Sequence, residues 1–153
     1  MLVRKDSIPA PTQNALDDLN LEFRTVAGGP NTVSEDVLAQ LDAGAPHAHR
    51  VWGRDRYETA AEVMTTYTDD ALWPPLHAEN VGVTAKPPDA LTGGSFLGLR
   101  KGCLVLTRSD SLPLCSSCFL GAHPATTQRA YVFGGPNSVE QDAVDDTNDA
   151  LLP

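Results

Sequence analysis

Charged side chains gather in one short stretch of the sequence, Gly53 to Ala60, which reads GRDRYETA. Arg54 and Arg56 have guanidinium groups, which bind phosphate or carboxylate in a bidentate manner, and Asp55 or Glu58 could act as an acid or base. A helix begins here by pattern, and a helix N-terminus favours anions. A structural explanation is also open, because Asp55 fits a helix cap and Arg56 could pair with a neighbouring carboxylate.

The cysteines are a second candidate for chemistry. Cys103, Cys115 and Cys118 make an odd number, so at least one thiol has no partner within the chain. The spacing of Cys115 and Cys118 allows a local disulfide, a redox pair or half of a zinc site, and Arg108 nearby could lower a thiol pKa. Zinc needs four ligands and no second pair exists, so we expect a disulfide or inert thiols and no bound metal.

Composition excludes several classes of partner. The net charge of −9 over 153 residues argues against nucleic acid, which selects clustered lysine and arginine. No stretch approaches the roughly 20 apolar residues of a membrane helix, so membrane insertion is not expected. The first residues lack the pattern of a signal peptide, which predicts either a cytoplasmic protein or a fragment whose export signal lies upstream.

The chain repeats itself at a spacing near that of a small domain. RKDSIP at residues 4–9 matches RSDSLP at 108–113, and VAGGPNTVSED at 26–36 matches VFGGPNSVEQD at 132–142. Nothing precedes the first copy to match residues 53–101. The sequence therefore predicts the C-terminal half of one repeat in residues 1–48, followed by a complete repeat in residues 49–153.

Alternating strands and helices must position the charged stretch. Ser34 fits the cap of a helix, Asp55 fits the cap of the next, and Ser138 with Gln141 forms a capping-box pattern. A small-residue helix is expected over 90–99. Strand patterns occupy residues 21–29, 49–53, 80–85, 102–107 and 129–135. This alternation is typical of an α/β domain with a largely parallel sheet.

Several ordered motifs resemble those of the cell-wall-binding repeat type 2 family. Gly53 to Ala60 resembles the family's G-x-D-R-Y-x-T-A opening, which includes Asp55, Tyr57 and Thr59. The later motifs follow in order: Asp89-Ala90-Leu91, Leu104 to Thr107, Asp110 to Pro113, and Val132 to Gly135 with Gly134 and Gly135. The resemblance covers nearly the whole chain. Two segments depart from the family pattern, namely Lys86 to Pro88 and residues 113–128, where Gly121 and Pro124 predict a short or irregular helix.

The resemblance implies a Rossmann/Toprim-like layered module, with helices flanking a largely parallel sheet. It also implies a non-catalytic domain without cofactor, which anchors an extracellular protein to an anionic polymer of the Gram-positive cell wall. Three such modules usually pack together, so neighbouring repeats or a homo-oligomer are expected partners. The polymer-binding residues that it suggests are Arg54, Arg56, Lys101, Leu104, Val105, Leu106, Thr107 and Arg108. The apolar triplet among them is equally typical of a buried strand.

Two other functions remain open from the residues. The glycine pairs at residues 28–29 and 134–135 follow strands and could approach a phosphate, as in a small α/β enzyme or a nucleotide-binding domain. The sequence has no G-x-G-x-x-G, Walker lysine or G-x-S-x-G pattern to support this. The chain could also be a structural spacer whose neighbours do the binding.

Overall fold

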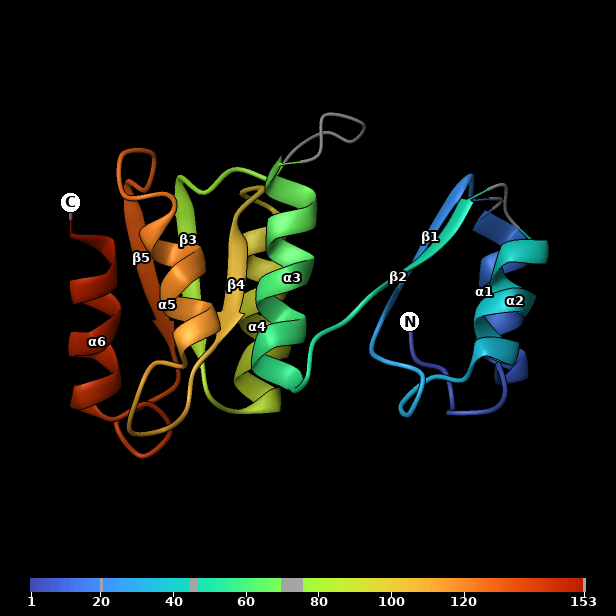
Figure 1. Cartoon of the computed structure of the whole chain (residues 1–153), viewed down its shortest axis with the longest axis horizontal. Coiled ribbons are helices and arrows are strands. Elements are labelled where there is room, and N and C mark those ends of the chain that lie inside the picture. Colours follow the sequence, from blue (N-terminus) through green and yellow to red (C-terminus); the bar gives the residue numbers. More distant parts are fainter. Residues whose placement is uncertain (20, 45–46, 70–75, 153) are drawn as a thin grey trace. The chain divides into compact units, whose positions relative to one another are not determined.

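The computed structural model describes residues 1–19, 21–44, 47–69 and 76–152. The chain divides into two compact units, Met1–Arg54 and Asp55–Pro153, called unit 1 and unit 2 below. Both are built from alternating helices and parallel strands (Figure 1). The α/β fold predicted from the sequence is therefore confirmed.

Unit 1 contains two helices and a two-stranded sheet. Its elements are α1 (Ala10–Leu19), β1 (Phe23–Ala27), α2 (Glu35–Ala43) and β2 (His47–Val51). The strands β1 and β2 pair in parallel, with Phe23 opposite His47 and Ala27 opposite Val51. Apolar residues from α1, β1, α2 and the turn before α2 form the core of this unit: Leu16, Val26, Val33, Val37 and Leu41.

Unit 2 contains four helices and a three-stranded sheet. Its elements are α3 (Arg56–Asp69), β3 (Asn80–Thr84), α4 (Pro87–Gly98), β4 (Cys103–Leu106), α5 (Leu114–Gly121), β5 (Arg129–Phe133) and α6 (Gln141–Leu151). The strand order is β4-β3-β5, and both pairings are parallel. Because β5 pairs with β3 alone, its outer edge carries no strand among the described residues.

Helices cover both faces of the unit 2 sheet. Val81 and Val83 point toward a core shared with α3 and α5, where Leu120 is fully buried. Between them Gly82 points toward α4, and a Cβ built there would lie 2.6 Å from the Phe133 ring. The alternation of side chains along a strand thus gives an aliphatic face and an aromatic face. Figure 1 shows α5 in front of the sheet, α4 behind it, and α6 outside the β5 edge.

The sequence analysis located most elements but misplaced some of their ends. Asp55 caps α3 as predicted, since its Oδ1 accepts hydrogen bonds from the backbone N–H groups of Tyr57 and Glu58 at 2.8 and 2.9 Å. The capping box of Ser138 with Gln141 was wrong, because α6 begins at Gln141 after Glu140. β2 spans 47–51 rather than 49–53, and α1 was not predicted. The predicted short helix is confirmed in α5, whose last residue is Gly121.

The two matching stretches of sequence fold alike. Gly28 and Gly134 follow β1 and β5 with φ angles of 134° and 127°, which disfavour residues with a side chain. Backbone hydrogen bonds also recur in pairs: Arg4 N to Ser7 O (2.9 Å) with Arg108 N to Ser111 O (3.0 Å), and Ser34 N to Lys5 O (2.8 Å) with Glu140 N to Ser109 O (2.7 Å). Position 28 in unit 1 is therefore equivalent to position 134 in unit 2, and position 34 to position 140. The boundary predicted between residues 48 and 49 stays a prediction.

Candidate functional site: the carboxyl edge of the unit 2 sheet

The candidate site lies where the three parallel strands of unit 2 end. Because β3, β4 and β5 run in the same direction, their carboxyl ends share one edge of the sheet. The helices α4, α5 and α6 follow these strands in the chain, so their N-termini open toward this edge. A helix N-terminus has partial positive charge, and parallel sheets bind ligands at their carboxyl ends.

Two of the predicted arginines meet at this edge around one aromatic ring. The Arg56 guanidinium lies 4.9 Å from the centre of the Tyr57 ring, and the Arg108 guanidinium lies 5.3 Å from it. Arg56 also donates a hydrogen bond from Nη2 to the Tyr57 hydroxyl at 2.8 Å. Arg56 begins α3, whereas Arg108 follows β4, so the packing of α3 on β4 brings the two cations together. Both arginines are exposed, and they present two forked donors to solvent.

The loop after β4 holds Arg108 in place. Thr107 is fully buried, and its hydroxyl donates a hydrogen bond to the Ser111 carbonyl at 2.9 Å. The Arg108 backbone N–H donates to the same carbonyl at 3.0 Å. Asp146 of α6 accepts a hydrogen bond from the Leu112 backbone N–H at 3.0 Å. The loop is therefore fixed at both ends before any ligand binds, which lowers the entropy cost of ordering it on binding.

Further polar groups lie at the ends of β3 and β5. Lys86, which sequence reasoning missed, donates from Nζ to the Asn137 carbonyl at 3.0 Å. Asp89 lies beside the turn after β5, since a Cβ built on Gly134 would be 3.0 Å from its Oδ2. Gly135 faces open space. Lys86 could have been found from its place directly after the β3 pattern, at the start of the proline pair that opens α4.

The other predicted polymer-binding residues are placed differently in the described structure. Arg54 is the last residue of unit 1, and Lys101 precedes β4, at the amino edge of the sheet. Val105 is 0% exposed, and so is Thr107, so neither side chain reaches the surface. Leu104 and Leu106 are half-buried. The structure thus brings together Arg56 and Arg108 only, while the apolar triplet mainly packs the sheet.

The cysteines of the structure are free thiols. Cys115 and Cys118 both lie on α5, and the predicted disulfide between them stays a prediction. Burial raises the pKa of the Cys103 thiol above its usual value of 9.0, and a hydrogen bond with Thr68 offsets part of this rise. Within the described residues no group of three His, Cys, Asp or Glu side chains could hold a metal ion.

We expect Cys103 to react far more slowly than Cys118 with a thiol reagent at pH 8. Thiolate is the reactive form, and Cys103 is both buried and shifted away from it, whereas Cys118 is exposed. A variant with Cys115→Ser and Cys118→Ser isolates Cys103 for this measurement by mass spectrometry. Equal labelling rates of Cys103 and Cys118 would contradict the buried position of Cys103.

The raised pKa of Cys103 also predicts that the free energy of unfolding falls as pH rises above 9, because only the unfolded thiol ionises there.

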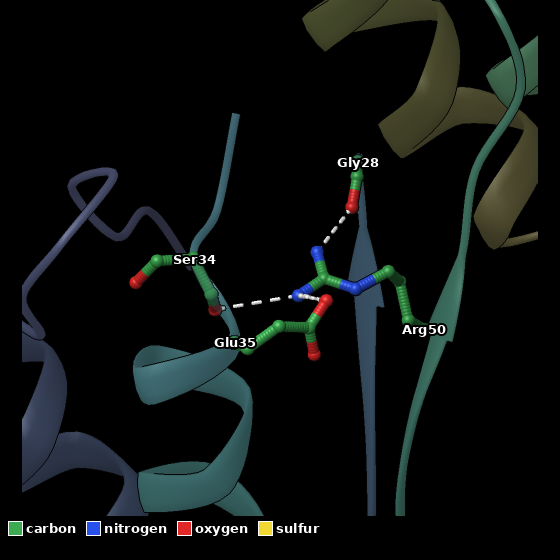
Figure 2. Close-up of polar contacts among 4 residues, drawn as sticks. All are labelled: Gly28, Ser34, Glu35 and Arg50. Carbon is green, nitrogen blue, oxygen red and sulfur yellow. Dashed lines mark hydrogen bonds and ion pairs between the residues drawn. The ribbon is translucent and has the colours of Figure 1, made fainter. Parts of the chain in front are cut away.

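A third arginine, Arg50, organises the turn after β1 in unit 1, and sequence reasoning missed it. Figure 2 shows its guanidinium between the ends of β1 and α2. Nη1 donates to the Gly28 carbonyl at 2.6 Å, and Nη2 donates to the Ser34 carbonyl at 3.3 Å. Nη2 also lies 3.4 Å from Glu35 Oε1. The Arg50 side chain is only 8% exposed, so this cation joins β2 to the turn after β1 and to the start of α2 rather than presenting a ligand surface.

Comparison with known proteins adds a family and a fold. The family model of cell wall binding domain 2 (CWB2) matches residues 50–144, which is more than half of the chain. Among solved structures, Cwp6 from Clostridium difficile is similar, with a TM-score of 0.79 and 22% sequence identity over 98% of this chain. Cwp8 from the same organism has a TM-score of 0.74 at 22% identity, also over 98% of this chain. This chain spans 23% and 24% of the lengths of those two proteins. No curated protein sequence matches it.

Proposed function

The chain belongs to the cell wall binding domain 2 family, and on this premise we propose that it is a non-catalytic module that binds an anionic polymer of the Gram-positive cell wall. We further propose that the polymer contacts the carboxyl edge of the unit 2 sheet. The observation that carries this proposal is the pair of exposed guanidinium groups, those of Arg56 and Arg108, held around Tyr57.

The chemistry of the pair suits phosphate or carboxylate groups spaced along a polymer. Each guanidinium is planar and can donate two parallel hydrogen bonds to one anionic group. Contact with the Tyr57 ring orients both arginine side chains, so less side-chain conformational entropy is lost when the polymer binds. Two forks near one another could bind neighbouring anionic groups of one chain.

Overall charge does not help such binding. The net charge of −9 repels an anionic polymer at long range, so attraction must be local to the arginine pair and the helix N-termini. Bridging divalent cations could strengthen contacts with the surrounding carboxylates. Salt screens both this long-range repulsion and the local attraction, because exposed charges are screened over roughly 8–10 Å at physiological ionic strength.

The family is one of binding domains, and this supports a role without catalysis. The cell wall lies outside the cytoplasmic membrane, so we propose an extracellular, wall-associated location. Among the described residues no helix has the length and apolar character needed to span a membrane.

Neutralising both arginines is expected to weaken binding to purified cell walls by about tenfold or more, because each charge-assisted hydrogen bond contributes about 1.5–3 kcal/mol. The variant is Arg56→Gln with Arg108→Gln, measured by co-sedimentation over a range of wall concentrations. Both side chains are exposed, so the change leaves the fold intact, and circular dichroism checks this.

The matched control is Arg100→Gln with Arg129→Gln. It changes the net charge equally, but Arg100 precedes β4 and Arg129 begins β5, so both lie toward the amino edge. We expect this control to bind walls like the original protein. Equal binding by all three proteins would show that Arg56 and Arg108 do not bind the polymer. No binding by the original protein would favour a function as a structural spacer.

Unit 1 supports the proposal that neighbouring repeats pack on this chain. A hollow of about 530 Å³ runs along β1 and is lined largely by apolar side chains from β1, α1 and the first residues of the chain. In unit 2 the equivalent strand, β5, pairs with β3, on the side opposite to the one where β1 pairs with β2, so among the described residues no strand lies on the β3-like side of β1. We propose that another repeat or a second copy of the chain covers this hollow.

A further inference from the structure

We infer that the outer edge of β5 is a docking site for a strand like β2, with an arginine at its fourth residue, supplied by another repeat of the same kind. This inference concerns assembly and is independent of the proposed polymer binding. It rests on comparing the two equivalent strands, β1 and β5, because one has such a strand on its edge and the other does not.

In unit 1, three residues at the end of β2, namely Arg50, Val51 and Trp52, contact the turn after β1. The Gly28 backbone N–H donates to the Val51 carbonyl at 2.9 Å. Arg50 donates to the carbonyls of Gly28 and Ser34 (Figure 2). The Trp52 ring covers Gly29 so closely that a Cβ built on that glycine would lie 2.9 Å from the ring.

In unit 2 the equivalent groups are present, but none of these contacts is made within the described residues. No backbone carbonyl accepts a hydrogen bond from the Gly134 N–H, and no arginine reaches the carbonyls of Gly134 and Glu140. A Cβ built on Gly135 would meet nothing within 4 Å, where Trp52 covers the equivalent Gly29. The turn after β5 is thus shaped like the turn after β1 but has no occupant.

The strand β1, which has β2 on its edge, is also more buried than the equivalent strand β5. Val26 of β1 is 6% exposed, whereas the equivalent Val132 of β5 is 40% exposed. Gly28 is buried and Gly134 is exposed. In unit 1, α2 packs mainly on β2, whereas in unit 2 the equivalent α6 packs on α5, outside the β5 edge (Figure 1). The place of the missing strand is therefore beside β5, where it would cover Val132.

Backbone and charge both fit such a strand. Alternate residues of a strand direct their N–H and C=O groups toward the same neighbour, so Gly28 and Val26 face β2. By equivalence, Ala130, Val132 and Gly134 face the open edge. Glu140 stands in the place of Ser34 and adds a carboxylate, and Asp89 adds another beside Gly134, so an arriving arginine would find complementary charge.

The test adds a second copy of residues 44–54 after Pro153, so that the strand is supplied at high effective concentration. In unit 1, α2 ends at Ala43 and β2 begins at His47, and the added segment leaves a longer stretch between α6, which ends at Leu151, and the second copy of His47. The measurement is amide hydrogen exchange of the whole chain at single-residue resolution. We expect protection at Ala130, Val132 and Gly134 to rise by roughly tenfold or more, as for amides that become hydrogen-bonded in a stable strand.

Two control extensions decide the outcome. Arg50→Ala in the appended copy alone should lose most of the gained protection, and a scrambled segment of the same composition should give none. Unchanged exchange of the β3 amides checks that unit 2 remains folded in each protein. No gain at the three β5 amides, or an equal gain from the scrambled segment, would overturn the inference.

Discussion

Arg50→Ala is expected to lower the free energy of opening of unit 1 by about 2–4 kcal/mol, since hydrogen bonds from a charged donor contribute about 1.5–3 kcal/mol each and a buried acceptor left unpaired adds a penalty. The guanidinium holds the carbonyls of Gly28 and Ser34 from a position that is 8% exposed. Without it, the end of β2 keeps the Gly28–Val51 backbone hydrogen bond but loses both side-chain hydrogen bonds to the turn. Hydrogen exchange of the β1 and β2 amides measures the loss directly.

Two further variants separate the parts of this contact. Glu35→Gln removes the ion pair at 3.4 Å, but the Glu35 side chain is 67% exposed, so its loss should cost less than about 1 kcal/mol. Arg50→Lys keeps the charge without the planar guanidinium, so its loss in free energy of opening should lie between those of Glu35→Gln and Arg50→Ala. If Glu35→Gln were as costly as Arg50→Ala, the ion pair rather than the two carbonyl contacts would hold β2.

The second large effect is expected from Leu120→Ala, which should lower the free energy of unfolding of unit 2 by about 2–5 kcal/mol. Leu120 is 0% exposed and lies in the core between α5 and the sheet. The substitution removes buried apolar surface and leaves a cavity that rigid neighbours fill only in part. Urea unfolding followed by circular dichroism gives the change.

The control for this prediction lies on the same helix. Leu114 is 79% exposed, so Leu114→Ala should change stability by no more than about 0.5 kcal/mol. Its effect reports the change in intrinsic helix propensity, which favours alanine slightly over leucine and applies to both variants. A cost below about 1 kcal/mol for Leu120→Ala would show that α5 is not firmly packed on the sheet.

Local patterns predicted what local chemistry decides. Asp55 was identified as a cap because an acidic residue directly preceded a helical stripe, and the structure confirms its two hydrogen bonds. The start of α6 was misjudged for a nonlocal reason. The Glu140 N–H is bound to the Ser109 carbonyl, and this contact from a distant loop holds residue 140 outside the helix. The alignment of residues 26–36 with 132–142 already placed Glu140 opposite the capping residue Ser34, so the repeat was a better guide here than the local Ser138–Gln141 pattern.

The sequence indicated which residue types to expect at the candidate site, but not which of the named residues lie together. The family motifs pointed to Arg56 and Arg108, yet they lie 52 positions apart in the sequence, so only the packing of α3 on β4 brings them to one ring. Lys101 was predicted as a further polymer-binding cation, but the structure places it before β4 and Arg108 after it. The four-residue strand β4 separates them, since a strand advances about 3.3 Å per residue.

The position of β2 links two kinds of boundary that do not coincide. The family similarity begins at Arg50, within β2, whereas the fold of unit 1 continues to Arg54. A gene segment duplicated at the similarity boundary would therefore carry a strand that completes the preceding copy instead of its own. Each added repeat would bring the strand that pairs with the last strand of the repeat before it. The number of repeats could therefore change during evolution while the contact between consecutive repeats stayed the same.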